Sequence, residues 1–148
     1  MTLKRTNSDD IDFINLVALL DQDLAIRDGE DHAFYNQFNK IDKIKHTIVY
    51  YEKGVPVGCG AFREKEPVTT EIKRMYVHPD YRNKGIAATV LAALEIWAKE
   101  VGYTYTILET GKKQPEAIRL YQKSNYTIIP NYPPYEEMDN SVCMKKTL

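Results

Sequence analysis

The chain has few cysteines and no excess of charge of either sign. Cys59 and Cys143 are its only cysteines in 148 residues, and they form no CxxC pair and no zinc-ligand spacing. Both are therefore predicted to be small buried residues, and no metal site is expected, since the three histidines also lack ligand spacing. The formal net charge of -1 argues against nucleic acid, or an acidic membrane, as a partner bound through bulk positive charge.

Long apolar segments are also missing. Asp9 and Asp10 lie where a signal peptide would need apolar residues, and the longest apolar runs are far shorter than the roughly 20 residues that span a bilayer. We therefore expect a cytoplasmic protein with no membrane partner. The sequence shows no repeat, low-complexity segment or linker, and its length is typical of one domain, so residues 1–148 are predicted to form a single domain.

The first third of the chain has mainly helical patterns. Residues 3–6 form a short extended opening, and Asn7 and Ser8 are candidate caps for an amphipathic helix from 9 to about 22. A second helix is predicted over residues 31–41. Its aromatic residues suit a core or a pocket wall.

The rest of the chain alternates strands and helices. Residues 46–77 follow a two-residue period with turn signals at Lys53-Gly54 and Glu66-Pro67, which predicts a three-strand antiparallel meander. After it we expect a helix over 86–101, a strand over 103–110, a helix over 114–123 and strands over 126–129 and 141–146. A helical crossover joins the fourth and fifth strands, which predicts that these two strands are parallel within a mixed sheet that has helices on both faces.

One short stretch, VHPDYRNKGIAATV at residues 77–90, combines two cations with a glycine at the start of a helix. A helix N-terminus leaves about four backbone amides without partners and carries partial positive charge, so it can bind an anion. Gly85 has no side chain to block the approach, and Arg82 and Lys84 add full charges. The stretch is suited to a phosphate or pyrophosphate.

Other phosphate loops do not fit this stretch. In a Walker loop the lysine follows the last glycine, whereas here Lys84 precedes Gly85. A dinucleotide fingerprint needs three spaced glycines after a first strand. Taken alone, the stretch would also suit a solvated basic turn that caps a helix.

Neighbouring segments remove that ambiguity. RNKGIA resembles the R/Q-x-x-G-x-G/A acyl-CoA signature of the GNAT superfamily of N-acetyltransferases, and IKRMYVHPDY before it resembles that family's cofactor-side strand. LETG and QPEAI resemble one bacterial branch, and PEAIRLYQKSNY resembles the family's last helix, with Asn125 where the family usually has glycine. Asparagine is the non-glycine residue that best tolerates the left-handed conformation, so we expect Asn125 to keep the helix stop. The resemblance implies an α/β fold with a GNAT-like mixed, mostly antiparallel seven-stranded sheet whose fourth and fifth strands are parallel and splayed. It also implies acetyl-CoA as co-substrate and no metal.

The resemblance assigns the cofactor site to two adjacent segments. The backbone of Met75, Tyr76 and Val77 would pair with the pantetheine arm of the cofactor. The loop and first helical turn would hold the pyrophosphate through Arg82, Asn83, Lys84, Gly85, Ile86 and Ala87.

Acyl transfer to an amine needs a base for the ammonium, whose pKa is roughly 10, and an acid for the departing thiolate. Glu71 is the predicted base, on a face shared with Lys73, Met75 and Val77 by two-residue alternation. The alternative is a solvent-facing strand carboxylate paired to a lysine. Tyr121 is the predicted acid, since the resemblance places it there; a core aromatic suits its spacing equally well. The predicted substrate contacts are Glu109, Tyr35 and Tyr132.

These expectations describe an N-acetyltransferase that moves an acetyl group from acetyl-CoA to a primary amine by direct attack in a ternary complex. The acceptor is expected to be a small molecule, and the protein a monomer or homodimer. A non-catalytic acyl-CoA sensor with the same fold is the alternative, and a nucleotide-phosphate-binding domain is a weaker one. No motif identifies the acceptor.

Overall fold

The computed structural model describes residues 1–39 and 43–148, and it contains the strands and helices in the predicted order. The last two residues of the predicted second helix, 40 and 41, lie outside the described residues. The elements are β1 (Thr2–Thr6), α1 (Ile11–Asp28), α2 (His32–Asn39), β2 (His46–Glu52), β3 (Val55–Glu66), β4 (Thr69–Val77), α3 (Ile86–Val101), β5 (Tyr105–Gly111), α4 (Pro115–Lys123), β6 (Thr127–Ile129) and β7 (Ser141–Thr147). A short 3₁₀ turn at 29–31 joins α1 to α2, and a second follows β4 at 79–81.

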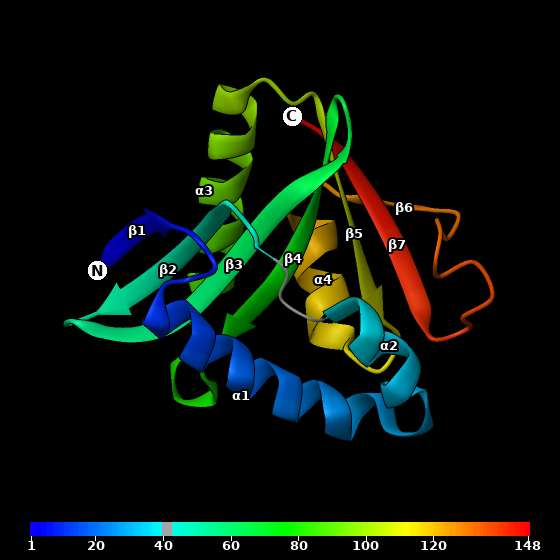
Figure 1. The fold of residues 1–148 in the computed structure, drawn as a ribbon, viewed down its shortest axis with the longest axis horizontal. Coiled ribbons are helices and arrows are strands. Elements are labelled where there is room, and N and C mark those ends of the chain that lie inside the picture. The colour runs from blue at the N-terminus through cyan, green and yellow to red at the C-terminus, as the bar shows by residue number, and fades with distance from the viewer. Residues whose placement is uncertain (40–42) are drawn as a thin grey trace.

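All seven strands belong to one sheet, in the order β1-β2-β3-β4-β5-β7-β6. The β4–β5 pair is parallel and the other pairs are antiparallel, which confirms the predicted mixed sheet. Helix α3 makes the crossover between the two parallel strands, as the sequence predicts (Figure 1).

Helices cover both faces of the sheet (Figure 1). On one face α1 packs Phe13, Leu16 and Val17 against β2 and β3, while Tyr35 of α2 packs near Cys143 of β7. On the other face the buried side chains of α3 and α4 pack against the central strands; they include Ile86, Val90, Leu91, Leu94, Ala98 and Tyr121. The predicted arrangement of helices on both faces is confirmed.

The β4 and β5 strands pair over only part of their length. Thr69, Thr70 and Glu71 lie opposite 105–107, and no pairing continues beyond that point although both strands do. Among the residues that the structure describes, the edge of β4 that faces β5 therefore has no strand partner over 72–77. A gap between two strands in the middle of a sheet leaves backbone donors and acceptors available for a ligand.

A bulge at Arg74 changes which side chains of β4 share a face. Lys73 lies opposite Ala61 and Tyr76 lies opposite Cys59, so one extra residue is accommodated, and Arg74 has a positive φ of 61°. Met75 consequently packs with the α3 cluster. The expectation that Glu71 shares a face with Met75 and Val77 is wrong, because it assumed an uninterrupted two-residue period.

Helix α1 starts later and ends later than predicted. Its cap is Asp10, whose Oδ1 accepts from the Asp12 amide at 2.9 Å and the Phe13 amide at 3.2 Å. The predicted caps are wrong, since Ser8 instead accepts from the Ile44 amide at 2.9 Å. The helix continues to Asp28 because no glycine or proline interrupts it before Gly29, whose φ is 54°.

Two further sequence expectations concern helices. Asn125 adopts the left-handed conformation, with φ of 73°, as predicted for the residue that replaces the family's glycine after α4. None of the helices in the described residues is long and apolar enough to cross a membrane.

Candidate functional site

A cavity of about 380 Å³ opens where β4 and β5 diverge, between α1 on one side and the first turns of α3 and α4 on the other. Three of the predicted residues, Glu71, Lys84 and Tyr132, do not line it. The other predicted site residues do line the cavity: Tyr35, Met75, Tyr76, Val77, Arg82, Asn83, Gly85, Ile86, Ala87, Glu109 and Tyr121.

The loop before α3 has the conformation of an anion site. Asn83 and Gly85 have positive φ values of 63° and 77°, and the amides of 83–85 donate no hydrogen bond to any described residue. The next three amides, 86–88, have no helical acceptor, because the first bond of the helix runs from Thr89 to Gly85. The loop and helix start together present a series of free donors to the cavity.

Two cations flank these donors. Nε of Arg82 donates to the Val77 carbonyl at 2.9 Å, and its guanidinium lies 5.7 Å from the centre of the Tyr76 ring. Arg82 is thus held at the cavity by contacts that leave its charge without an ion pair to any residue that the structure describes. Lys84 lies outside the lining, with Nζ 5.4 Å from the centre of the Tyr81 ring.

Tyr121 projects from α4 into the lining of the same cavity and is 6% exposed. Its hydroxyl makes no hydrogen bond within the described part of the chain. Burial, and then the charge of Glu109, raise the pKa of Tyr121 above its ordinary value. The phenol therefore stays protonated at physiological pH and has its hydrogen available to a ligand.

Glu109 lies near the end of β5 and is the cavity carboxylate with the most strongly altered acidity. Burial raises its pKa to about 7; Asp28 and Glu71 add to the rise, while a hydrogen bond from Ser141 and the charge of Lys73 oppose it. A carboxylate with a pKa near neutrality can take up a proton and lose it again at physiological pH.

Glu71 has a different environment. It is 1% exposed, and one of its oxygens, Oε1, lies 3.0 Å from both Nε and Nη2 of Arg63. The Tyr132 hydroxyl donates to the other oxygen at 2.7 Å. Glu71 is therefore a strand carboxylate in an ion pair, but it is buried and its partner is an arginine, whereas the alternative reading of the sequence had a solvent-facing carboxylate beside a lysine.

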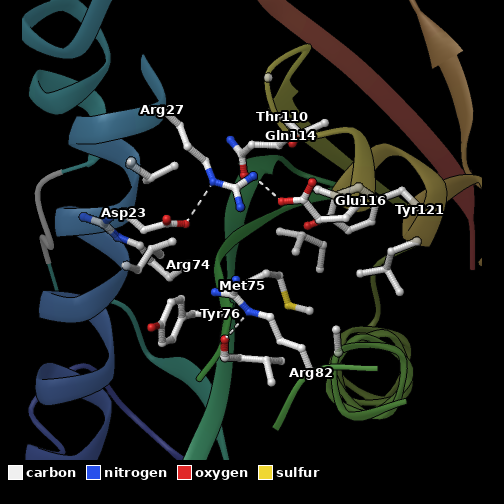
Figure 2. A pocket seen from close by; sticks show the side chains of 18 of the residues that line it. Asp23, Arg27, Arg74, Met75, Tyr76, Arg82, Thr110, Gln114, Glu116 and Tyr121 are labelled. Atoms are coloured by element: carbon white, nitrogen blue, oxygen red, sulfur yellow. Dashed lines mark hydrogen bonds and ion pairs between the residues drawn. The ribbon is translucent and has the colours of Figure 1, made fainter. Parts of the chain in front are cut away.

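Sequence patterns did not single out six charged residues that line the cavity: Asp23, Arg27, Asp28, Lys73, Arg74 and Glu116. Figure 2 shows Arg27 reaching from α1 across the cavity to Glu116 of α4, with which it forms an ion pair, while Nε of Arg27 lies 3.2 Å from Asp23. The four-residue spacing of Asp23 and Arg27 is a recognisable helical pair. No local pattern reveals the contact with Glu116, because it depends on the length of α1.

The two cysteines are free and buried, as predicted. Both are 0% exposed, and burial raises the pKa of Cys59 to about 12 and that of Cys143 to about 11. Neither side chain lines the cavity. A thiol with these properties is a poor nucleophile, since the thiolate is the reactive form.

Sequence relatives of the chain are acetyltransferases. Residues 14–126 match the acetyltransferase (GNAT) family. An IAA acetyltransferase from Azospirillum brasilense is 34% identical over 102 residues, which is 68% of this chain and 67% of that protein. The protein YsnE from Bacillus subtilis, which is named as an uncharacterized N-acetyltransferase, is 34% identical over 93 residues, or 62% of each chain.

Solved structures have the same fold. A Klebsiella pneumoniae protein described as an acyl-CoA N-acyltransferase superposes with a TM-score of 0.82 and 29% identity, covering 99% of this chain and 97% of that one. The protein yncA of Salmonella typhimurium, determined with acetyl-CoA, has a TM-score of 0.68 and 18% identity, covering 100% and 95% of the two chains. Acetyl-CoA is the cofactor expected from the sequence, and the free amides of the loop before α3 suit its phosphates. With its splayed parallel strands, its anion loop and a family match over most of its length, the chain belongs to the GNAT family of acetyltransferases.

Proposed function

We propose that the protein transfers an acetyl group from acetyl-CoA to the primary amine of a small molecule, by direct attack within a ternary complex. One observation carries the proposal: a proton acceptor, Glu109, and a proton donor, Tyr121, line the same cavity as the anion loop. Acetyl-CoA would bind with its phosphates at the amides of 83–88 and its pantetheine arm along the free edge of β4.

The reaction needs two proton movements. The neutral amine attacks the thioester carbonyl, a C–N bond forms, the C–S bond breaks, and the coenzyme A thiolate leaves. Glu109 takes the proton released by the amine, and Tyr121 donates a hydrogen bond or proton to the departing sulfur. Both groups have the required protonation at neutral pH, since Glu109 titrates near 7 and the pKa of Tyr121 is raised.

The base in this proposal is Glu109 and not Glu71, the residue chosen from the sequence. Glu71 is engaged by Arg63 and Tyr132 and does not line the cavity, so it would act by positioning the strand. Direct attack is preferred over an acyl-enzyme because both thiols are buried with raised pKa values.

The test measures thiol release from acetyl-CoA with a panel of primary amines, together with acetyl-CoA binding by calorimetry. Glu109→Gln and Tyr121→Phe are expected to lower kcat by about a hundredfold or more, the usual contribution of a positioned acid or base. Their affinity for acetyl-CoA should stay within about twofold, because neither residue belongs to the anion loop.

Glu71→Gln provides the comparison. If Glu71→Gln abolishes turnover while Glu109→Gln keeps it, the base assignment is reversed. A wild-type protein that binds acetyl-CoA but releases no thiol with any amine would instead be the non-catalytic sensor.

A further inference from the structure

The charged side chains that line the cavity are not all paired. Arg27 is held by Asp23 and Glu116, and Arg82 stands at the anion loop. Asp28 is neither held in such an ion pair nor part of the anion loop. It lines the cavity, and no described residue makes an ion pair or a side-chain hydrogen bond with it.

The position of Asp28 is unfavourable for an unpaired carboxylate. It is 5% exposed and is the last residue of α1, where the helix dipole is negative. Burial raises the pKa of Asp28, and Asp31 adds to the rise, while the nearby charges of His32 and Lys113 oppose it. The ionised Asp28 side chain is therefore destabilising, and a cation in the cavity would compensate its charge.

Lys73 is the one free ammonium group among the described residues that line the cavity. It lies within electrostatic reach of Glu71 and Glu109, both of which favour its charge, while burial lowers its pKa. Its charge is therefore offset by two neighbouring carboxylates. Arg63 and Arg74 oppose the charge of Lys73, and the charges with the largest effects on Lys73 and on Asp28 do not include each other. Lys73 also makes no ion pair with Asp28.

We propose that Asp28 binds a second ammonium group of the acceptor, so that the acceptor is a diamine or polyamine. This inference rests on the proposed function, in which the reacting amine lies at Glu109. Both carboxylates line the same cavity, and the charge of Asp28 contributes to the raised pKa of Glu109, so we expect a short dication to span the two. The ammonium bound at Asp28 stays protonated, and the other amine gives up its proton to Glu109.

The test compares three probes that share a four-carbon amine: n-butylamine, putrescine and γ-aminobutyrate. They carry a methyl, an ammonium and a carboxylate at the far end. Binding is measured by calorimetry on protein saturated with coenzyme A, which cannot transfer an acetyl group. Putrescine is expected to bind at least tenfold more tightly than n-butylamine, and γ-aminobutyrate to bind more weakly than either.

Two variants locate the effect. Asp28→Asn should remove the advantage of putrescine over n-butylamine, whereas Asp31→Asn removes a neighbouring charge that does not line the cavity and should keep it. Asp28→Asn should also melt at the same temperature as the wild type or higher, since it removes an unpaired buried carboxylate. Equal binding of putrescine and n-butylamine, preference for γ-aminobutyrate, or an unchanged preference in Asp28→Asn would overturn the inference.

A turnover measurement separates this inference from the proposed function. Selective putrescine binding with no thiol released from acetyl-CoA would refute the transferase proposal and leave the dication site in place. Thiol release at equal kcat/KM with n-butylamine and putrescine, together with equal binding, would refute the dication site and leave the transferase proposal in place.

Discussion

Replacing Glu109 by glutamine is expected to stabilise the protein above neutral pH while it removes most of the turnover. The cause is the pKa of Glu109, which burial raises from 4.5 to about 7 in the folded chain. Each pKa unit corresponds to about 1.4 kcal/mol, so ionising this carboxylate inside the folded protein costs about 3 kcal/mol. Glutamine has the same shape and no charge, so it avoids that cost.

The pH dependence follows from which state holds the proton more tightly. Because folding raises the pKa, the folded state binds more protons than the unfolded state between pH 4.5 and about 7, and the contribution of Glu109 to stability falls as the pH rises through that window. Below this window both states are protonated and Glu109 costs nothing. The stability difference between variant and wild type should therefore start near zero, grow through the window and level off above about pH 7.

Urea denaturation at about pH 4, 6 and 8 measures this difference, and at the highest pH the midpoint of thermal unfolding should rise by about 10 °C. Glu137→Gln is the matched control, because Glu137 is exposed and makes no hydrogen bond with a described residue. A difference that does not change with pH, or a Glu109→Gln variant less stable than the wild type at about pH 8, would refute the reasoning.

Three further changes test the structure around the site. Tyr132→Phe removes the 2.7 Å hydrogen bond to Glu71 and should cost about 1.5–3 kcal/mol in urea denaturation; no loss would show that Glu71 is not held this way. Gly60→Ala places a Cβ 2.5 Å from Sδ of Met75 and should cost about 1–3 kcal/mol, again by urea denaturation, and an unchanged protein would contradict the bulge geometry. Lys84→Ala should weaken acetyl-CoA binding in calorimetry by only about twofold to fivefold, since Lys84 lies outside the lining; a much larger loss would place it at the phosphates.

The part of the cavity that suits the phosphates of acetyl-CoA could be predicted from the sequence, because its residues are consecutive in the chain. The free amides, the positive φ values and the cation of the anion loop all lie within 82–88, so a short pattern contains the whole arrangement. The order of strands and helices was predictable for the same reason, since each element has its own periodicity. A sequence pattern cannot show an irregularity such as the bulge at Arg74, and for that reason the prediction placed Met75 on the wrong face relative to Glu71.

The choice between two carboxylates shows a second limit. Glu71 and Glu109 both lie on strands beside the gap, and nothing in the local sequence separates them. Tertiary contacts do: Arg63 is opposite Glu71 on the neighbouring strand, and Tyr132 comes from the connection before β7. These partners occupy Glu71, whereas Glu109 lines the cavity, and for this reason the proposed function assigns the base to Glu109.

The part of the cavity that is proposed to bind the acceptor owes some of its charged residues to the length of α1. A helix that ended near residue 22, as the apolar spacing predicted, would not carry Arg27 and Asp28 along the cavity. The helix continues to Asp28, and its last turn supplies both the ion pair to Glu116 and a carboxylate, Asp28, that is unpaired within the described part of the chain. Under the proposed function, the loop before α3 selects the donor, and the last turn of α1 selects the acceptor. Changing charges in that turn, with the anion loop untouched, should therefore alter the preferred amine without altering the affinity for acetyl-CoA.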